Sequence, residues 1–238
     1  MSQDVSPNVH VETSITSIAY GGIGYPKKLM AIRSPPKLLY LRGRTELLDK
    51  PAISIVGTRE ASQSSLDWAF NAAAQSAKQG YVVVSGGAIG VDTAVHNGAL
   101  SVGGGTICVL GSGLNRIYPK VNTELINRIS EVGLVVSECP PDSSGNKITL
   151  IERNRITSAL GDALLVVATK PKGGAMTQSL IALRQSKRVF APDPTLGLMP
   201  NAGIERLFAK GKITRVRDVR DVFVQLPKAA AQLSIATF

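Results

Sequence analysis

Residues 82–100 read VVVSGGAIGVDTAVHNGAL, and this stretch decides the fold. It begins as an apolar run rich in β-branched residues and continues, after a group of glycines, with apolar residues at helical spacing. Such a pattern predicts a β-strand that turns through a glycine loop into an α-helix. The loop leaves three interpretations open: a site that holds a phosphate group, the start of a catalytic or metal site, or only a tight turn.

The same alternation of strand and helix continues along the chain. The predicted strands are residues 38–41, 52–57, 81–87, 105–111, 134–138, 163–169 and 188–192. The predicted helices are residues 27–32, 64–79, 91–102, 120–131, the stretch through LIERNRITSAL (150–160) and 174–186. Because the strand runs are continuously apolar, they indicate a mostly parallel sheet with helices on both faces. The fold class is therefore α/β, doubly wound and extended Rossmann-like.

Three regions differ in composition. Residues 1–19 are polar and weakly patterned, and we expect a flexible N-terminal arm. Residues 20–195 carry the regular pattern and form the extended Rossmann-like domain. Residues 196–238 form a C-terminal extension with a short helix, the basic run KGKITRVRDVR and an Ala-rich tail. The basic run is either a strip that faces DNA or a solvated tail, and the sequence leaves both open.

Composition limits the location and the class of the protein. The chain has 238 residues, of which 44% are hydrophobic, and its longest apolar runs are too short to cross a bilayer. The N-terminus lacks the basic and apolar regions of a secretory signal. Cys108 and Cys139 lie where reduced thiols of a cytoplasmic protein are expected, and two cysteines are too few for a structural zinc site. We therefore expect a cytoplasmic protein without membrane contact.

The charge of the chain favours a polyanionic partner. The formal net charge is +10 and the pI is about 9.8, and nucleic acid is the commonest polyanion of a cytosol. A generally cationic enzyme is the alternative. Aromatic residues make up only 5% of the chain, so a platform of many stacking rings is not expected.

Four loops leave the carboxyl ends of the predicted strands, where open parallel sheets bind ligands. They are GTRE (57–60), SGGAIGVD (85–92), GSGLNRIYP (111–119) and PKGGAMT (171–177). Glycines let backbone N–H groups approach an anion, and a following helix N-terminus adds positive partial charge. Each loop alone is explained by a turn, but the set together predicts a phosphate site. None matches a dinucleotide fingerprint or a P-loop, so we predict no cofactor.

The stretch ERNRIT (152–157) adds two arginines with an asparagine between them. Guanidinium groups bind phosphates well, although a solvated helix face is the alternative. The candidate phosphate-binding residues are Arg59, Ser85, Gly86, Gly87, Ala88, Gly90, Arg153, Asn154, Arg155, Lys172, Gly173 and Gly174.

Asp92 and His96 lie four residues apart and so share one face of the predicted helix. A metal or acid–base pair is one interpretation, but a metal needs more ligands, and His10 is the only other histidine. We expect instead that Asp92 orients the glycine loop and that His96 is held in the core by hydrogen bonds. Both are thus predicted as structural supports, without a metal.

The order of the motifs resembles the DprA/Smf family of DNA-processing proteins. The run IVGTRE, SGGAIGVDTAVHNGAL, GSGLNRIYP, VVSECPP and RNRI matches the family pattern from about residue 25 to about residue 191. The resemblance implies an extended Rossmann fold that binds single-stranded DNA, usually as a homodimer. It also implies loading of a RecA-type recombinase during natural transformation. By position, Arg59, the loop 85–90, Asn154, Arg155 and Lys172 would line the DNA pocket of the family.

The chain departs from the family pattern at several positions. Where the family usually reads Ser-Gly-Ser-Leu-x-Thr-Ala, Gly173 replaces the first Ser and Gln178 stands at the Thr. Leu150 and Ile151 replace an aromatic-Pro pair. The length leaves no room for both the N-terminal helical domain and the C-terminal winged-helix domain of longer members, so we expect a short form.

A second resemblance gives the alternative function. The loop PKGGAMTQS is similar to that of the cytokinin-activating phosphoribohydrolases, whose Pro-Gly-Gly-x-Gly-Thr precedes a catalytic Glu. Here Gln178 and Ser179 stand where the acid should fall, and Glu138 and Glu152 are weak substitutes. We therefore predict a protein that is not an enzyme. The alternative is a nucleotide-binding or phosphoribohydrolase-like protein that acts on a small phosphorylated ligand, in a defence or mobile-element context.

Overall fold

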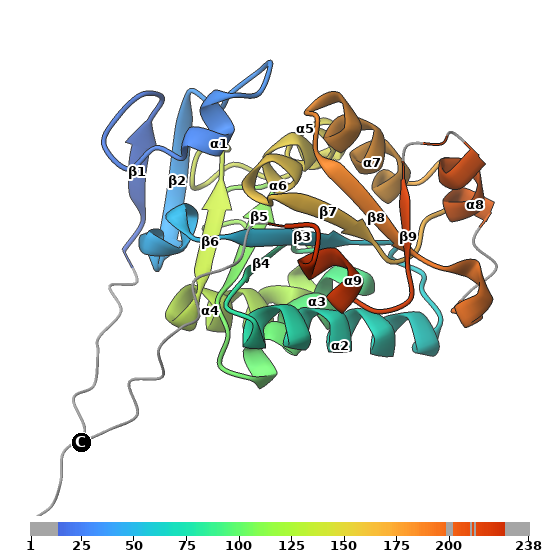
Figure 1. Ribbon diagram of the computed structural model, residues 1–238. Coiled ribbons are helices and arrows are strands. Elements are labelled where there is room, and N and C mark those ends of the chain that lie inside the picture. Colours follow the sequence, from blue (N-terminus) through green and yellow to red (C-terminus); the bar gives the residue numbers. More distant parts are fainter. Residues whose placement is uncertain (1–13, 199–201, 210, 212, 227–238) are drawn as a thin grey trace, which may run out of the picture.

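The computed structural model describes residues 14–198, 202–209, 211 and 213–226. These residues form one sheet in the order β1-β2-β6-β5-β4-β3-β7-β8-β9, with helices on both sides of it (Figure 1). The strands are β1 (Thr16–Ala19), β2 (Leu38–Gly43), β3 (Ala52–Val56), β4 (Val82–Gly86), β5 (Thr106–Leu110), β6 (Leu134–Ser137), β7 (Ala163–Val166), β8 (Arg188–Pro192) and β9 (Thr214–Val216).

The strands from β6 to β9 in this order pair parallel to their neighbours, whereas β1 and β2 pair antiparallel. Because β2 runs against both β1 and β6, the strand β1 points the same way as the parallel strands. The central strands are buried along their whole length, as continuous apolar runs predict.

The helices cover both faces of the sheet. They are α1 (Lys27–Met30), α2 (Gln63–Lys78), α3 (Val91–Ser101), α4 (Thr123–Val132), α5 (Lys147–Glu152), α6 (Asn154–Leu160), α7 (Gly174–Arg184), α8 (Ala202–Ala209) and α9 (Arg220–Phe223). Short 3-10 helices are η1 (Thr45–Asp49), η2 (Lys120–Asn122) and η3 (Pro194–Leu196). Buried side chains of α2, α3, α4 and α9 pack on one face, and those of α1, α6, α7 and α8 pack on the other. The predicted doubly wound, mostly parallel α/β fold is confirmed.

Helix α3 lies close against α2 because a glycine stands at the contact. A Cβ atom at Gly98 would collide with the backbone of Phe70. The start of α2 is fixed differently, by the N-cap residue Ser62, whose hydroxyl accepts the N–H of Ser65 at 3.2 Å. These two contacts help to place the loops that enter α2 and α3 at the carboxyl edge of the sheet.

Several elements differ from the sequence prediction. Residues 16–19, which we assigned to the arm, form β1 at one edge of the sheet, and residues 214–216 of the extension form β9 at the other. Both are short, and most of their side chains are exposed, so no apolar run marks them. The predicted helix through 150–160 is divided between α5 and α6. Residues 1–13 of the predicted arm and 227–238 of the predicted tail lie outside the described residues.

In the described ranges, no helix is both long enough and apolar enough to cross a bilayer.

Candidate functional site

A cavity of about 700 Å³ opens at the carboxyl edge of the sheet. Its walls come from the loops that follow β3, β4, β5 and β7, from α5 and its preceding turn, from the first turns of α3 and α6, and from the first two turns of α7. The sheet therefore brings together segments that lie more than 100 residues apart, from Gly57 to Gln178. This is the edge at which open parallel sheets bind ligands.

Cationic side chains surround the cavity. Arg59, Lys147, Lys170 and Lys172 are exposed at it, and Arg153 lies deeper. Lys170 forms an ion pair of 2.7 Å with Glu60. Arg59, Lys147 and Lys172 have no ion-pair partner among the described residues.

The cavity walls hold few carboxylates to balance this charge. Glu60 is paired with Lys170, and Asp92 is buried. The site consequently carries net positive charge and attracts anions.

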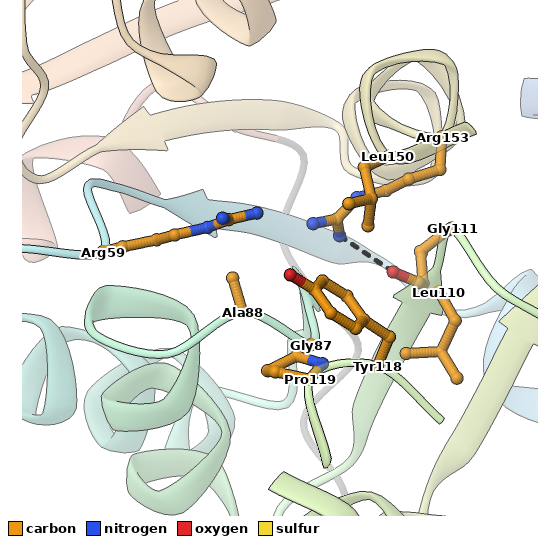
Figure 2. A pocket seen from close by; sticks show the side chains of 10 residues that line it. Arg59, Gly87, Ala88, Leu110, Gly111, Tyr118, Pro119, Leu150 and Arg153 are labelled. Atoms are coloured by element: carbon orange, nitrogen blue, oxygen red, sulfur yellow. Dashed lines mark hydrogen bonds between the residues drawn. The ribbon is translucent and has the colours of Figure 1, made fainter. Parts of the chain in front are cut away.

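A narrower pocket lies at the ends of β4 and β5. Figure 2 shows the guanidinium groups of Arg59 and Arg153 entering it from opposite sides, with the Tyr118 hydroxyl pointing between them. Ala88 and Leu150 also line it. Tyr118 is 44% exposed and lines both the pocket and the larger cavity. The two spaces share these residues and so belong to one site.

Arg153 connects this site to the core. Its Nη1 donates a hydrogen bond of 2.8 Å to the carbonyl of Val109, and its Nη2 lies 3.8 Å from Oδ2 of Asp92. The guanidinium lies so close over Gly86 that a Cβ atom at that position would collide with it. Gly86 therefore serves to admit the arginine, and not to expose a backbone N–H group.

Asp92 lies under the glycine loop. Burial raises the pKa of its carboxyl, while Arg153 and hydrogen bonds from the backbone of Ala88 and Gly57 act to lower that pKa. These contacts join the loops after β3 and β4 to the first turn of α3. Among the described residues, no cluster of His, Cys, Asp or Glu could hold a metal ion.

His96 holds the same loop from the core side. Its Nε2 lies 2.8 Å from the carbonyl of Gly86, and its Nδ1 lies 2.8 Å from Oγ1 of Thr106. Burial lowers the pKa of His96 to about 4, so the ring is neutral at pH 7. A carbonyl can only accept, so Nε2 carries the proton and donates to Gly86, while the Thr106 hydroxyl beside Nδ1 also lies 2.8 Å from the carbonyl of Val83, to which it donates. This geometry matches a supporting role for His96.

The structure brings together eight of the predicted phosphate-binding residues at the cavity and its pocket. They are Arg59, Gly87, Ala88, Arg153, Asn154, Lys172, Gly173 and Gly174.

Four other predicted residues lie away from the cavity walls. Ser85 is buried and donates to the carbonyl of Ile55 at 2.7 Å. Gly86 accommodates Arg153, as described above. Gly90 has a φ of 84° next to the carbonyls of Thr58 and Arg59, so it serves the turn into α3.

Arg155 is the fourth. Its guanidinium donates to both carboxylate oxygens of Glu138, to the carbonyl of Ser34 and to that of Glu152. These bonds use the donors that a phosphate would need.

Sequence reasoning missed Tyr118, Lys147, Lys170 and Gln178, which all line the cavity. Tyr118 lies in the loop 111–119, which was recognised as a glycine loop and as a family motif, but Tyr118 was not named as a site residue. Lys170 precedes the recognised loop by one residue, and Gln178 was considered only as a departure from the two family patterns. Lys147 lies in the long connection after β6, where no local signal shows that it returns to the sheet edge.

The sequence pattern of the family described as DNA recombination-mediator protein A matches residues 16–227. Protein Smf of Synechocystis sp. is 37% identical over 171 residues, which cover 70% of this chain and 43% of that protein. The DNA processing protein DprA of Bacillus subtilis is 32% identical over 222 residues, which cover 93% of this chain and 74% of that protein. The chain thus spans less than half of the Synechocystis relative.

Solved structures give the same result. The X-ray structure of DNA processing protein A from Streptococcus pneumoniae matches with a TM-score of 0.83 and 32% identity, covering 90% of this chain and 75% of that one. A structure on the single-stranded DNA binding mode of DNA processing protein A from Helicobacter pylori matches with a TM-score of 0.81 and 30% identity, covering 90% and 96%. The molybdenum cofactor carrier protein of Chlamydomonas reinhardtii, at 22% identity and a TM-score of 0.51, shares the fold alone.

These matches extend over nearly the whole described part of the chain, including every segment that builds the cavity. They agree with the ordered motifs of the sequence, whose resemblance is thereby confirmed. The chain belongs to the DNA recombination-mediator protein A family, to which the DprA and Smf proteins also belong.

Proposed function

We propose that this chain binds single-stranded DNA in the cavity at the carboxyl edge of its sheet. The bound strand is then a substrate onto which a RecA-type recombinase is loaded. The observation that carries the proposal is a set of cations around a cavity of about 700 Å³ that have no ion-pair partner in the described part of the chain: Arg59, Lys147 and Lys172. That volume lies in the range of small-molecule sites, so it suits one or a few nucleotides of a strand.

Binding in this arrangement is mainly electrostatic. The cations lie at the rim, where they neutralise successive phosphates and release counterions from the strand. Arg153 and the backbone of Gly87 and Ala88 lie deeper, in the narrow pocket. Affinity should fall steeply with salt and depend little on sequence, because phosphate contacts carry no base information.

One wall of the cavity is suited to bases. Tyr118, Leu150 and Ile151 line it, and Tyr118 and Ile151 are each 44% exposed. Bases stack on aromatic rings and pack on apolar side chains only when they are unpaired. Such apolar side chains beside cations predict a preference for single strands over duplex.

The wider biological role rests on relatives. The chain belongs to the family of DNA recombination-mediator protein A, and its relatives in Bacillus subtilis and Streptococcus pneumoniae are DNA processing proteins. We infer a RecA-type recombinase as the protein partner, a homodimer as the working form and the cytoplasm as the location. All three are carried over from the family to which the chain belongs.

The carboxylates near the cavity are paired or buried, and this favours a binding role over hydrolysis of a small nucleotide. Glu60 is paired with Lys170, Asp92 is buried against Arg153, and Glu138 is paired with Arg155. An N-glycosidic bond is cleaved with the help of a general acid or base near the scissile bond. No carboxylate in the described cavity walls is free for that task.

Fluorescence anisotropy of a labelled strand, measured from low to high salt, tests the proposal. Arg59→Ala and Lys172→Ala should each weaken binding for all sequences alike. Each should also reduce the slope of log affinity against log salt by about 0.7, the value for one phosphate contact on a single strand. Lys78→Ala is the matched control, because Lys78 is exposed at the end of α2, at the opposite edge of the sheet.

Absence of binding by the wild-type protein at low salt would refute the proposal, as would an equal loss in the control. If a nucleoside monophosphate raises the melting temperature and an oligonucleotide does not, the nucleotide-binding alternative is correct.

A further inference from the structure

Gln178 carries a buried polar group that the fold leaves without a partner. The residue is 5% exposed and lines the cavity from the second turn of α7. Its Nε2 forms no hydrogen bond among the described residues. A buried donor without a partner costs about 1–3 kcal/mol of stability. The best explanation of an unpartnered amide in a cavity wall is a ligand that accepts a hydrogen bond from it.

The amide lies next to an uncapped helix N-terminus. Helix α7 has 11 residues, its N-cap residue Gly173 provides no side-chain cap, and its first turn contains no acidic residue. The N–H of Gly173 bonds to Lys170, and that of Thr177 bonds to Gly173. The N–H groups between these two, from residues 174 to 176, make no backbone hydrogen bond among the described residues.

Helix geometry predicts that the side chain of Gln178 leans toward these N–H groups. Side chains of a helix lean toward its N-terminus, so residue 178 covers the turn that begins at Gly174. The terminal torsion of glutamine is broad, so the amide can turn its N–H groups to a ligand in the cavity. Gly174 leaves the approach open, since a Cβ atom there would meet nothing within 4 Å.

We propose that the N-terminus of α7 and the amide of Gln178 together form a subsite for one phosphate group of the bound strand. The inference rests on the proposed function and specifies which part of the ligand this wall takes. In this subsite, backbone N–H groups and Nε2 of Gln178 donate to the non-bridging oxygens, and Lys172, which lines the same cavity, adds positive charge. The positive end of the helix dipole adds to the attraction.

A phosphate fits this wall better than the edge of a base. A base edge presents donors as well as acceptors, whereas the free groups of this wall are N–H donors and a cation. Backbone N–H groups, the amide N–H groups of Gln178 and the ammonium of Lys172 are all donors, and the oxygens of a phosphate only accept hydrogen bonds. Tyr118, Leu150 and Ile151, which come from the loop after β5 and from α5, line the same cavity and suit the base.

Gln178→Met separates this role from a structural one. Methionine has a similar length and no polar atom that needs a partner, so the variant should melt at a higher temperature than wild type. Its affinity for a single strand should fall about tenfold, since a hydrogen bond to a charged acceptor is lost. Gln79→Met, at the exposed end of α2, is the control and should change neither quantity. A lower melting temperature with unchanged affinity would overturn the proposal.

Binding of chemically modified strands identifies which group of the DNA the Gln178 amide contacts. On a strand with neutral methylphosphonate linkages, which lose the charge and one of the two non-bridging oxygens, the difference between wild type and Gln178→Met should shrink. On a strand of abasic sites, the difference between the two proteins should persist. If the difference disappears on the abasic strand and remains on the methylphosphonate strand, the amide contacts a base and the phosphate subsite is refuted.

A measurement without DNA separates this inference from the proposed function. Inorganic phosphate, at constant ionic strength, should raise the melting temperature of wild type and have a smaller effect on Gln178→Met. If it does so while no strand binds, the subsite stands and the DNA-binding function falls. If strands bind but phosphate acts equally on both proteins and the affinities are equal, the function stands and the subsite is refuted.

Discussion

Arg155 donates from Nη2 to both carboxylate oxygens of Glu138, at distances of 2.6 and 2.7 Å. Its Nε donates to the carbonyl of Ser34 at 2.8 Å. The side chain thus joins α6 to the end of β6 and to the segment between α1 and β2. Two residues away, Arg153 lies at the narrow pocket instead. Neighbouring arginines of one motif therefore have different tasks.

Replacing Arg155 should affect stability and leave DNA binding intact. Arg155→Met removes several hydrogen bonds and leaves Glu138 without its partner, so we expect a loss of about 1–3 kcal/mol in the free energy of unfolding. Affinity for a single strand, measured well below the melting temperature, should stay within about twofold. Urea unfolding and anisotropy on the same samples provide both numbers.

Arg59→Met is the matched comparison, because Arg59 is exposed at the cavity without an ion-pair partner among the described residues. It should lower affinity without lowering stability. If Arg155→Met instead binds a single strand more weakly while its free energy of unfolding is unchanged, Arg155 is a phosphate ligand.

Gly86 should tolerate no side chain. A methyl group there would overlap the guanidinium of Arg153, which is fixed by its bond to Val109. We expect Gly86→Ala to lose about 1–3 kcal/mol of unfolding free energy, the usual cost of overpacking. The double variant Gly86→Ala with Arg153→Ala should be more stable than the sum of the two single changes predicts. Gly174→Ala is the control, since nothing lies within 4 Å of a Cβ atom there, and it should fold normally.

His96 should make the protein sensitive to mild acid. Burial lowers its pKa in the folded protein to about 4, whereas the unfolded chain has the ordinary value of about 6.5. The unfolded state therefore binds more protons between these values, and stability falls as the pH drops from about 6.5 to about 4. The full effect is roughly 3 kcal/mol.

Asp92 opposes this effect, so the measurement has to separate the two residues. Its pKa is raised by burial, and its contribution to stability is largest in acid and falls as the pH rises above about 3.8. Chemical unfolding at several pH values in an Asp92→Asn background isolates the histidine. Adding His96→Gln there should remove the acid sensitivity between pH 6.5 and 4. An unchanged pH profile would show that the imidazole is not the buried neutral group described.

The central sheet could be predicted because its strands are buried on both faces. Runs such as residues 52–56 and 82–86 must be apolar throughout, and this requirement is visible in any single sequence. Loops at strand ends were recognisable for a related reason, since they carry glycines that turn the chain. The edge strands β1 and β9 have no such constraint: most of their side chains face solvent, and their pairing depends on neighbours far along the chain.

The location of the site at the sheet edge could be predicted more easily than the side chains that line it. Arg153 and Arg155 are two residues apart at the junction of α5 and α6, and only the packing of that junction decides which one faces the cavity. Gly86 resembles a phosphate-loop glycine in the sequence but is required by the arginine above it. Lys147 reaches the cavity only because α5 folds back over the end of β5, a tertiary fact that local patterns do not contain.

Tyr118 should be the residue that distinguishes a strand with bases from one without. Its ring is 44% exposed in the cavity beside Leu150, so we expect it to stack on an unpaired base. Tyr118→Phe keeps the ring and should bind as wild type does. Tyr118→Ala should lose about tenfold in affinity, within the range measured for one base stacked on an aromatic side chain. Anisotropy with an ordinary strand measures this loss.

The abasic strand makes the Tyr118 experiment specific. It keeps every phosphate and removes the bases, so Tyr118→Ala and wild type should bind it equally if the ring contacts a base. Tyr20→Ala is the control, because Tyr20 is 49% exposed in the loop after β1 and does not line the cavity, and it should have no effect on either strand. An equal loss of affinity on both strands would mean that Tyr118 acts through its hydroxyl or through the shape of the loop. Failure of Tyr118→Phe would then identify the hydroxyl, which points between Arg59 and Arg153 (Figure 2).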